Sequence, residues 1–286
     1  MLDKILVPLD GSANSSSILT QVRRLLLASD AEVVLFHVVE AEPGGSPHAR
    51  TREIALAREG LLPLRDALRA DGARAELEVR HGVPAVSILD YAHEIAPSLV
   101  AMSTHGRTGW SRMVRGSVAE RVLRYSHHPL LLVRPEGAAA DRPFDRILVP
   151  MDGSEFSARI LPAVEDLSRL YGSEVVLEHA VESAPRLPAG PVVSERTLAP
   201  WRDRIEKAGI RCRVRIDHRA PPWGIVDAAE AEGAGLIALT THGRSGPSRW
   251  VFGSVAESVI RRSTTPLLVG RTACFESPEV PARATA

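Results

Sequence analysis

The chain contains the same stretches twice, and this repeat limits the folds that it can adopt. The segment KILVPLDGS at residues 4–12 returns as RILVPMDGS at residues 146–154, so that Asp10 recurs as Asp152, 142 residues later. A second segment, MSTHGRTGWSRMVRGSVAERV at 102–122, returns as LTTHGRSGPSRWVFGSVAESV at 239–259. The 286 residues suffice for two domains of about 100–150 residues each. We therefore predict two copies of one fold.

Each copy alternates apolar runs of strand length with longer segments of helical periodicity. In the first copy the expected strands lie at 5–9, 32–39, 73–80, 98–103 and 129–133, and the expected helices at 16–29, 50–70, 86–96 and 117–126. Nearly continuous apolar strands joined by helical crossovers indicate a parallel sheet buried on both faces. We predict two repeated doubly wound α/β domains, each a five-stranded parallel sheet with helices on both faces, Rossmann-like.

The join between the copies is marked by composition. RPEGAAADRP at 134–143 is rich in Pro, Gly and Ala, which is typical of a linker. We predict a first domain at 1–135, a linker at 136–144 and a second domain at 145–271. The Pro-containing segment 272–286 is expected to be a flexible tail.

Charge and cysteine content exclude several classes of partner. The 35 basic and 35 acidic residues balance, so no overall field attracts the chain to nucleic acid or to an anionic membrane. No apolar run approaches the roughly 18–20 residues that cross a bilayer. Cys212 and Cys274 lack CxxC spacing and indicate neither a disulfide framework nor a zinc site. We expect a cytoplasmic protein without a metal site of its own.

The repeated glycine-rich loop has the features of an anion site. Glycines let backbone approach a ligand, and the first amides of the helix that starts near Gly116 lack helical acceptors. An anion is favoured there, with Arg107 adding positive charge. The alternative is that Gly116 and Ser117 only cap a helix and that the loop glycines only serve turns.

The aspartates of the repeated DGS also admit two interpretations. Asp10 and Asp152 follow the first strand of each copy, where a carboxylate can accept hydrogen bonds from a ligand's amine or ribose hydroxyls. Alternatively, each forms an Asx-turn or N-cap that leads into the first helix. Both roles are compatible.

Together these motifs resemble the universal stress protein family, whose fold is adenine nucleotide alpha hydrolase-like. The resemblance covers both halves and rests on VPLDGS, LFHVVE, MSTHGRTG, GSVAERV and HPLLLV. In the ATP-binding branch of that family the loop reads glycine, two residues, glycine, nine residues, glycine, then serine or threonine. This chain has the last three landmarks in both copies, but Ser103 and Thr240 replace the first glycine.

The resemblance implies ATP as the ligand and assigns contacts residue by residue. In the first domain Pro8, Asp10 and Val38 would flank adenine, and the phosphates would be held by Gly106, Gly116, Ser117 and Val118. Mg²⁺ would arrive with ATP near Ser117. The predicted site residues of the first domain are Pro8, Asp10, Val38, Ser103, Gly106, Arg107, Gly116, Ser117 and Val118. In the second domain they are Pro150, Asp152, Ala180, Thr240, Gly243, Arg244, Gly253, Ser254 and Val255. We expect the second site to be weaker, because Thr240 is bulkier and Ala180 packs less than valine.

Three functions stay open at this stage. The first is an ATP-binding stress-response regulator, the second a slow ATPase, and the third a nucleotide-free structural or stress-tolerance protein. No catalytic residue is assigned, because the lysine-bearing P-loop is absent and His105 and His242 are isolated candidates for a base. The resemblance also implies pairing through the fifth strand. Here the strands at 129–133 and 266–269 are apolar enough for such pairing, within the chain as a pseudo-dimer or between two chains as a homodimer.

Overall fold

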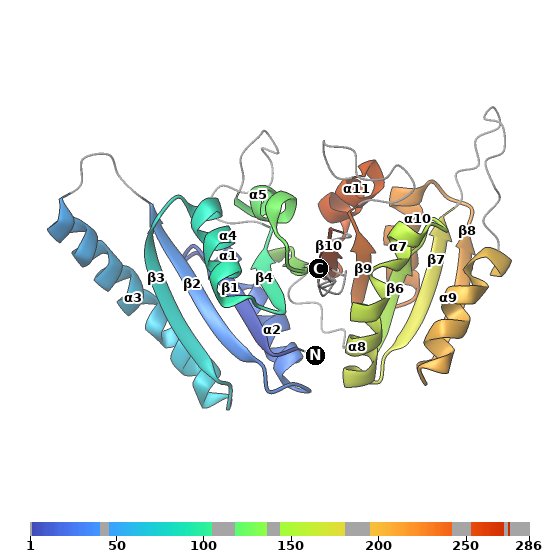
Figure 1. Ribbon diagram of the computed structural model, residues 1–286, viewed down its shortest axis with the longest axis horizontal. Helices are drawn as coiled ribbons and strands as arrows, with labels where there is room; N and C mark the ends of the chain where they lie inside the picture. The colour runs from blue at the N-terminus through green and yellow to red at the C-terminus, as the bar shows by residue number, and fades with distance from the viewer. Residues whose placement is uncertain are drawn as a thin grey trace, which may run out of the picture.

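The structure is a computed structural model, and it describes residues 2–40, 46–104, 118–135, 144–180, 195–241, 253–271 and 274. Figure 1 shows two similar α/β units side by side, joined at the centre through their strands.

The first half follows the predicted alternation of strands and helices. Its elements are β1 (Lys4–Leu9), α1 (Ala13–Ser16), α2 (Ile18–Leu26), β2 (Glu32–Glu40), α3 (Pro47–Ala70), β3 (Ala75–Gly82), α4 (Pro84–Ile95), β4 (Leu99–Ser103), α5 (Val118–Tyr125) and β5 (Leu130–Val133). All five expected strands are present at the expected places.

The second half repeats this order. Its elements are β6 (Arg146–Pro150), α7 (Glu155–Ala158), α8 (Leu161–Tyr171), β7 (Glu174–Ala180), α9 (Glu195–Lys207), β8 (Cys212–Asp217), α10 (Pro221–Ala231), β9 (Leu236–Thr240), α11 (Ser254–Arg262) and β10 (Leu267–Gly270). The prediction of two copies of one fold is confirmed.

The strands of both halves form one continuous sheet of ten strands. Their order is β3-β2-β1-β4-β5-β10-β9-β6-β7-β8. Every neighbouring pair is parallel except β5 and β10, which run antiparallel with Leu131 opposite Leu268. The two five-stranded parallel sheets therefore meet edge to edge, each through its fifth strand.

Helices cover both faces of this sheet, as the doubly wound prediction requires. Residues of α2, α3, α8 and α9 pack on one face, in a cluster that includes Leu25, Leu68, Val164 and Ile205. Residues of α4, α5, α10 and α11 pack on the other face. Both clusters contain residues from both halves of the chain, so each hydrophobic core runs across the central strand pair.

Further contacts cross the boundary between the halves. The Tyr171 hydroxyl in α8 donates to the Leu25 carbonyl oxygen at the end of α2, at 2.6 Å. The guanidinium of Arg134, just after β5, donates to the Arg261 carbonyl oxygen near the end of α11, at 3.0 Å. These bonds attach helices of one half to the other half beyond the strand pairing.

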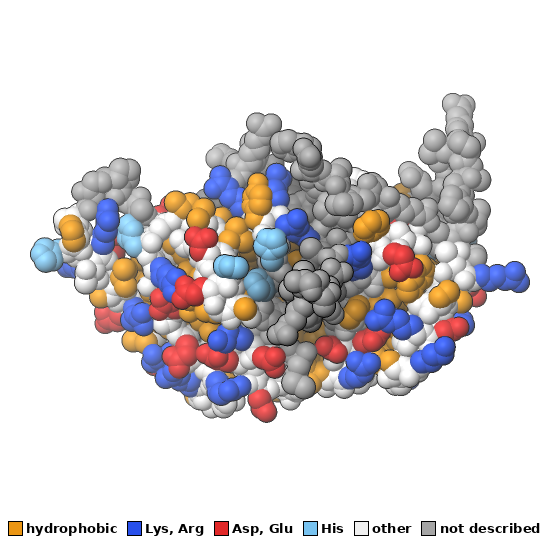
Figure 2. Space-filling view, viewed as in Figure 1, with side chains coloured by type: hydrophobic (Ala, Val, Ile, Leu, Met, Phe, Trp, Pro, Cys, Tyr) orange, Lys and Arg blue, Asp and Glu red, His pale blue; other side chains and the backbone are white. Residues whose placement is uncertain are grey.

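The charged surface agrees with the balanced composition. Figure 2 shows basic and acidic side chains interspersed over the face in view, without a large patch of either sign. This mixture provides no broad electrostatic surface for a polyanion on that face.

Candidate functional site

The strand order reverses beside the first strand of each half. β1 lies between β2 and β4, and β6 lies between β7 and β9. At such a reversal the connections leave to opposite sides, and ligands of open α/β sheets bind beyond the carboxyl ends of the strands there. Asp10 follows β1 and Ser103 ends β4, while Asp152 follows β6 and Thr240 ends β9. The fold thus brings these predicted residues to the expected edge of the sheet.

The turn after β1 is built around the Asp10 carboxylate. Its Oδ1 accepts hydrogen bonds from the Ser12 amide at 2.9 Å and from the Ser12 hydroxyl at 2.6 Å. The Ser12 hydroxyl oxygen in turn accepts from the Ser15 amide and caps α1. Gly11 has φ of 80°, a left-handed conformation that favours glycine. The Asx-turn interpretation of this motif is therefore confirmed.

The second half repeats this turn almost atom for atom. The Asp152 Oδ1 accepts from the Ser154 amide at 2.9 Å and from its hydroxyl at 2.6 Å. Gly153 has φ of 81°. The Asp-Gly-Ser sequence thus fixes the same carboxylate position in both halves, whatever else that carboxylate binds.

In each half, a histidine that was not predicted as a site residue forms a hydrogen bond with the backbone next to this turn. The His37 Nδ1 lies 2.8 Å from the Leu9 carbonyl oxygen, and the His179 Nδ1 lies 2.6 Å from the Met151 carbonyl oxygen. A carbonyl can only accept, so Nδ1 carries the proton in each case. The signal was present, because LFHVVE and LEHAVE keep histidine at the same repeat position.

The residues that replace the first motif glycine are enclosed by protein. Ser103 is 7 % exposed and Thr240 is 8 % exposed. Among the described residues Ala96 is the only non-glycine with positive φ, so neither Ser103 nor Thr240 has the backbone conformation that favours glycine. The departure from the glycine pattern therefore changes the space at this point and leaves the backbone unstrained.

In the second half the structure describes the helix start that follows the loop. Gly253 precedes α11, and its amide donates to the Thr241 carbonyl oxygen at 2.8 Å. A Cβ on Gly253 would lie 3.3 Å from that oxygen, a tight contact with backbone. Ser254 and Val255 are exposed in the first turn, where helix amides have no intrahelical acceptor. This arrangement offers donors to an anion.

Several predicted site residues lie outside the described part of the chain, so the structure does not place them. They are Gly106, Arg107, Gly116, Ser117, Gly243 and Arg244. Val118, which follows them, begins α5 and is partly buried against the core.

The wall predicted for adenine differs between the halves. In the first half Pro8 aligns with Phe36 across β1 and β2, and Val38 is 9 % exposed. The Phe36 ring stacks on Tyr91 of α4, with ring centroids 4.5 Å apart, and the Arg80 guanidinium lies 4.3 Å from the Tyr91 centroid. In the first half, aromatic side chains thus fill the space between the sheet and α4 next to the predicted adenine contacts.

The second half has a carboxylate in the place of that aromatic ring. Glu178 aligns with Pro150 as Phe36 aligns with Pro8, and it is 0 % exposed. Burial, and to a smaller extent nearby Asp217, raise the pKa of Glu178 to about 8, while Arg215 and Arg219 oppose the rise. Glu178 is not among the site residues predicted from the sequence, although LEHAVE places a charge where LFHVVE has an aromatic ring.

The charged groups beside Glu178 form ion pairs with one another. Asp217 accepts from Arg219 Nη2 at 2.8 Å and from Arg215 Nη2 at 3.2 Å, and these bonds hold the pKa of that carboxyl well below its usual range. Arg215 Nη1 also donates to Glu232 at 3.0 Å. The two guanidinium groups are therefore directed toward carboxylates other than Glu178.

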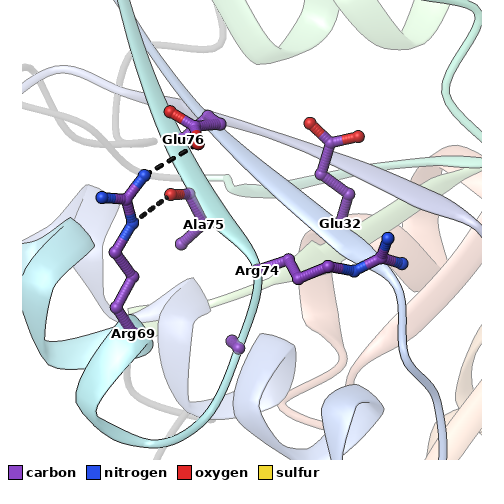
Figure 3. A pocket seen from close by; sticks show the side chains of 6 residues that line it. Glu32, Arg69, Arg74, Ala75 and Glu76 are labelled. Carbon is purple, nitrogen blue, oxygen red and sulfur yellow. Dashed lines mark hydrogen bonds and ion pairs between the residues drawn. The ribbon is translucent and has the colours of Figure 1, made fainter.

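A hollow of about 380 Å³ lies at the opposite end of the strands, between the amino ends of β2 and β3. Figure 3 shows Arg69 reaching across it to Glu76 and to the Ala75 carbonyl oxygen. Arg74 donates to the Asp30 carbonyl oxygen. These arginines are engaged by neighbouring acceptors, and the hollow is separate from the edge of the sheet where the predicted residues meet.

Comparison with known proteins agrees with the fold and the repeat. The model of the universal stress protein family matches residues 1–134 and again residues 143–271. This chain is a tandem member of the universal stress protein family.

Similar proteins from bacteria and archaea support the assignment. A universal stress protein of Mycolicibacterium smegmatis is 25 % identical over 93 % of this chain and 96 % of its own length. One from Methanocaldococcus jannaschii is 33 % identical over 46 % of this chain and 81 % of its own length. The crystal structure of a universal stress protein from Archaeoglobus fulgidus DSM 4304 matches with a TM-score of 0.78 and 25 % identity, covering 95 % of this chain and 99 % of that one.

Within the described ranges, no helix is long and apolar enough to cross a membrane. Among those same residues, no three or more His, Cys, Asp or Glu side chains form a group suited to a metal ion.

Proposed function

We propose that this tandem universal stress protein binds adenine nucleotides, with ATP as the principal ligand, and acts as a stress-response regulator in the cytoplasm. The observation that carries the proposal is the start of α11. Gly253 brings backbone against the Thr241 carbonyl oxygen so closely that a side chain would crowd it. The first amides of α11 lie beside the carboxyl end of β9, where the phosphates of a bound nucleotide would bind.

The turn after the first strand supports the same proposal. Asp10 and Asp152 are held in identical turns at the reversal of strand order, which positions one carboxylate per domain for a ribose or an amine. Mg²⁺ would accompany the nucleotide near Ser117. The first domain is the tighter site, because Val38 offers more packing area than Ala180 and Ser103 more space than Thr240.

The β5–β10 pairing supports an internal arrangement in which the two domains act as a pseudo-dimer within one chain. Strands β3 and β8 form the outer edges of the sheet, so a homodimer of chains would use a surface other than the fifth strands.

Titration of the full chain with ATP, followed by calorimetry, tests the proposal. We expect binding to the wild-type protein, loss of the tighter phase in Gly116→Trp, and loss of the weaker phase in Gly253→Trp. Gly60→Trp is the matched control, because a side chain at Gly60 would meet open space on α3. Absence of binding to the wild-type protein, with no adenine nucleotide released on denaturation, would refute the proposal and favour a nucleotide-free role.

Incubation of the same protein with ATP distinguishes a regulator from a slow ATPase. Release of ADP at catalytic turnover, abolished in Gly116→Trp, would assign hydrolysis to the site. A regulator would retain intact ATP over the same period.

A further inference from the structure

Glu178 and Arg215 lie side by side on the face of the sheet that carries the predicted adenine wall. They are register partners on β7 and β8, and Glu178 is also the register partner of Pro150 on β6. Ala180, two residues along β7, points to the same face, because successive strand residues alternate between faces. Both charged residues therefore adjoin positions predicted to contact a nucleotide base.

Each of the two side chains contains a buried polar atom without a protein partner. Neither carboxylate oxygen of Glu178 has a hydrogen-bond partner among the described residues, and the same holds for the Arg215 Nε. A buried polar group that lacks a hydrogen bond destabilises the folded protein, and more so when it is charged. An acceptor and a donor on adjacent strands thus both lack a partner.

The second half also lacks the aromatic side chains that fill this region in the first half. Phe36 corresponds to Glu178, and Tyr91 of α4 corresponds to Ala228 of α10. Ala228 is fully buried. The stack of Phe36 on Tyr91 is therefore replaced by a carboxylate and a methyl group.

We propose that Glu178 and Arg215 read the base edge of the ligand in the second domain. Glu178 accepts a hydrogen bond from an exocyclic amino group, and Arg215 Nε donates to the adjacent ring nitrogen. The ligand class is a nitrogen heterocycle with an amino group beside a ring nitrogen acceptor, as in the six-membered ring of adenine. This inference rests on the proposed nucleotide function and adds a specificity determinant to one of its two sites.

Two ligands that differ only in the amino group test this assignment. In the Gly116→Trp background, which isolates the second site, ATP is compared with the triphosphate of purine riboside, which lacks the 6-amino group. Because removing one partner leaves the buried carboxyl oxygen of Glu178 without a hydrogen bond, we expect the loss of the amino group to weaken binding about tenfold or more. In Glu178→Leu the two ligands should bind within about threefold of each other. Glu178→Gln, whose amide oxygen still accepts, should retain most of the preference for ATP.

The controls separate this inference from the proposed function. Glu230→Leu changes an exposed glutamate on α10 and should leave the preference for ATP intact. If ATP binds the second site and Glu178→Leu keeps the full preference, the base-reading role is refuted while the nucleotide function stands. If the wild-type chain binds no nucleotide, both are refuted. Strong coupling between Glu178→Gln and Arg215→Lys in the stability of the ligand-free protein would show that the two groups bond to each other, and would also overturn the inference.

Discussion

The buried carboxyl group of Glu178 links the stability of the second domain to pH. In the unfolded chain this group releases its proton near pH 4.5, whereas burial shifts its pKa in the folded chain to about 8. Between these values the folded state holds one more proton than the unfolded state. Raising the pH through this window therefore destabilises the fold, by about 1.4 kcal/mol per pH unit for this group. The facing charged groups Asp217, Arg215 and Arg219 are already included in the shift.

We expect Glu178→Gln to remove this pH dependence, because the amide is neutral throughout. Urea unfolding at pH 5.5 and at pH 8.5 measures it: the variant should gain stability relative to wild type as the pH rises. Glu230→Gln, an exposed glutamate on α10, is the matched control and should follow wild type. The contrary result is a difference in unfolding free energy between wild type and Glu178→Gln that is the same at pH 5.5 and at pH 8.5. It would show that Glu178 ionises in the folded state without penalty.

At the scale of elements, an aromatic pair attaches α4 to the sheet in the first domain. Phe36 of β2 and Tyr91 of α4 are stacked with an interplanar angle of 22°, and both are largely buried. Aromatic pairs of this kind contribute about 0.5–1.5 kcal/mol beyond the burial of their area. The second domain has no equivalent pair, so α10 relies on small residues: a Cβ at Gly224 would come within 3.3 Å of the Ala180 Cβ.

A double-mutant cycle measures the aromatic contribution. We expect Phe36→Leu and Tyr91→Leu to couple by about 0.5–1.5 kcal/mol in the free energy of unfolding. The control cycle pairs Phe36→Leu with Tyr125→Leu, since Tyr125 is 57 % exposed on α5. Its coupling should be close to zero. Equal coupling in the two cycles would mean that the stacking geometry adds nothing specific.

The sequence predicted these elements well because their signals are local. The apolar run at 5–9 and the helical periodicity at 86–96 correspond to β1 and α4. The repeat transfers both assignments to the second half, at a shift of 142 residues for the strand and 137 for the helix. The Asp-Gly-Ser turns could also be anticipated, because aspartate and a left-handed glycine define them within three residues. The predicted site residues of the glycine-rich loops, such as Gly106 and Gly243, lie outside the described residues and stay predictions.

Features that depend on contacts between distant residues could not be predicted in the same way. Glu178 lies on β7, whose sequence EVVLEHA looks like an ordinary strand apart from this glutamate in its interior. Its lack of a hydrogen-bond partner among the described residues depends on where Arg215 and Arg219 direct their guanidinium groups. The fifth strands were expected to pair, but their apolar sequences fit pairing within a chain and between chains equally well. Only the three-dimensional arrangement distinguishes such alternatives.

At the scale of the whole molecule, the two domains share their hydrophobic cores. Leu131 of β5 and Leu268 of β10 are opposite each other at the centre of the sheet, and each is no more than 3 % exposed. They belong to one cluster that extends from Ile5 in the first domain to Leu198 in the second. Separating the domains would expose this cluster and both strand edges, so unfolding one domain removes support from the other.

We therefore expect the full chain to unfold in a single thermal transition, with a calorimetric enthalpy equal to the van't Hoff enthalpy. Leu268→Ala should lower the stability of the whole chain by about 2–5 kcal/mol, because it opens a cavity at the shared strand pair. Leu27→Ala is the control, since Leu27 is 86 % exposed at the end of α2, and it should change the melting temperature little. Two separate transitions in the wild-type protein, only one of which moves in Leu268→Ala, would show instead that the domains unfold independently and that the central strand pair couples them weakly.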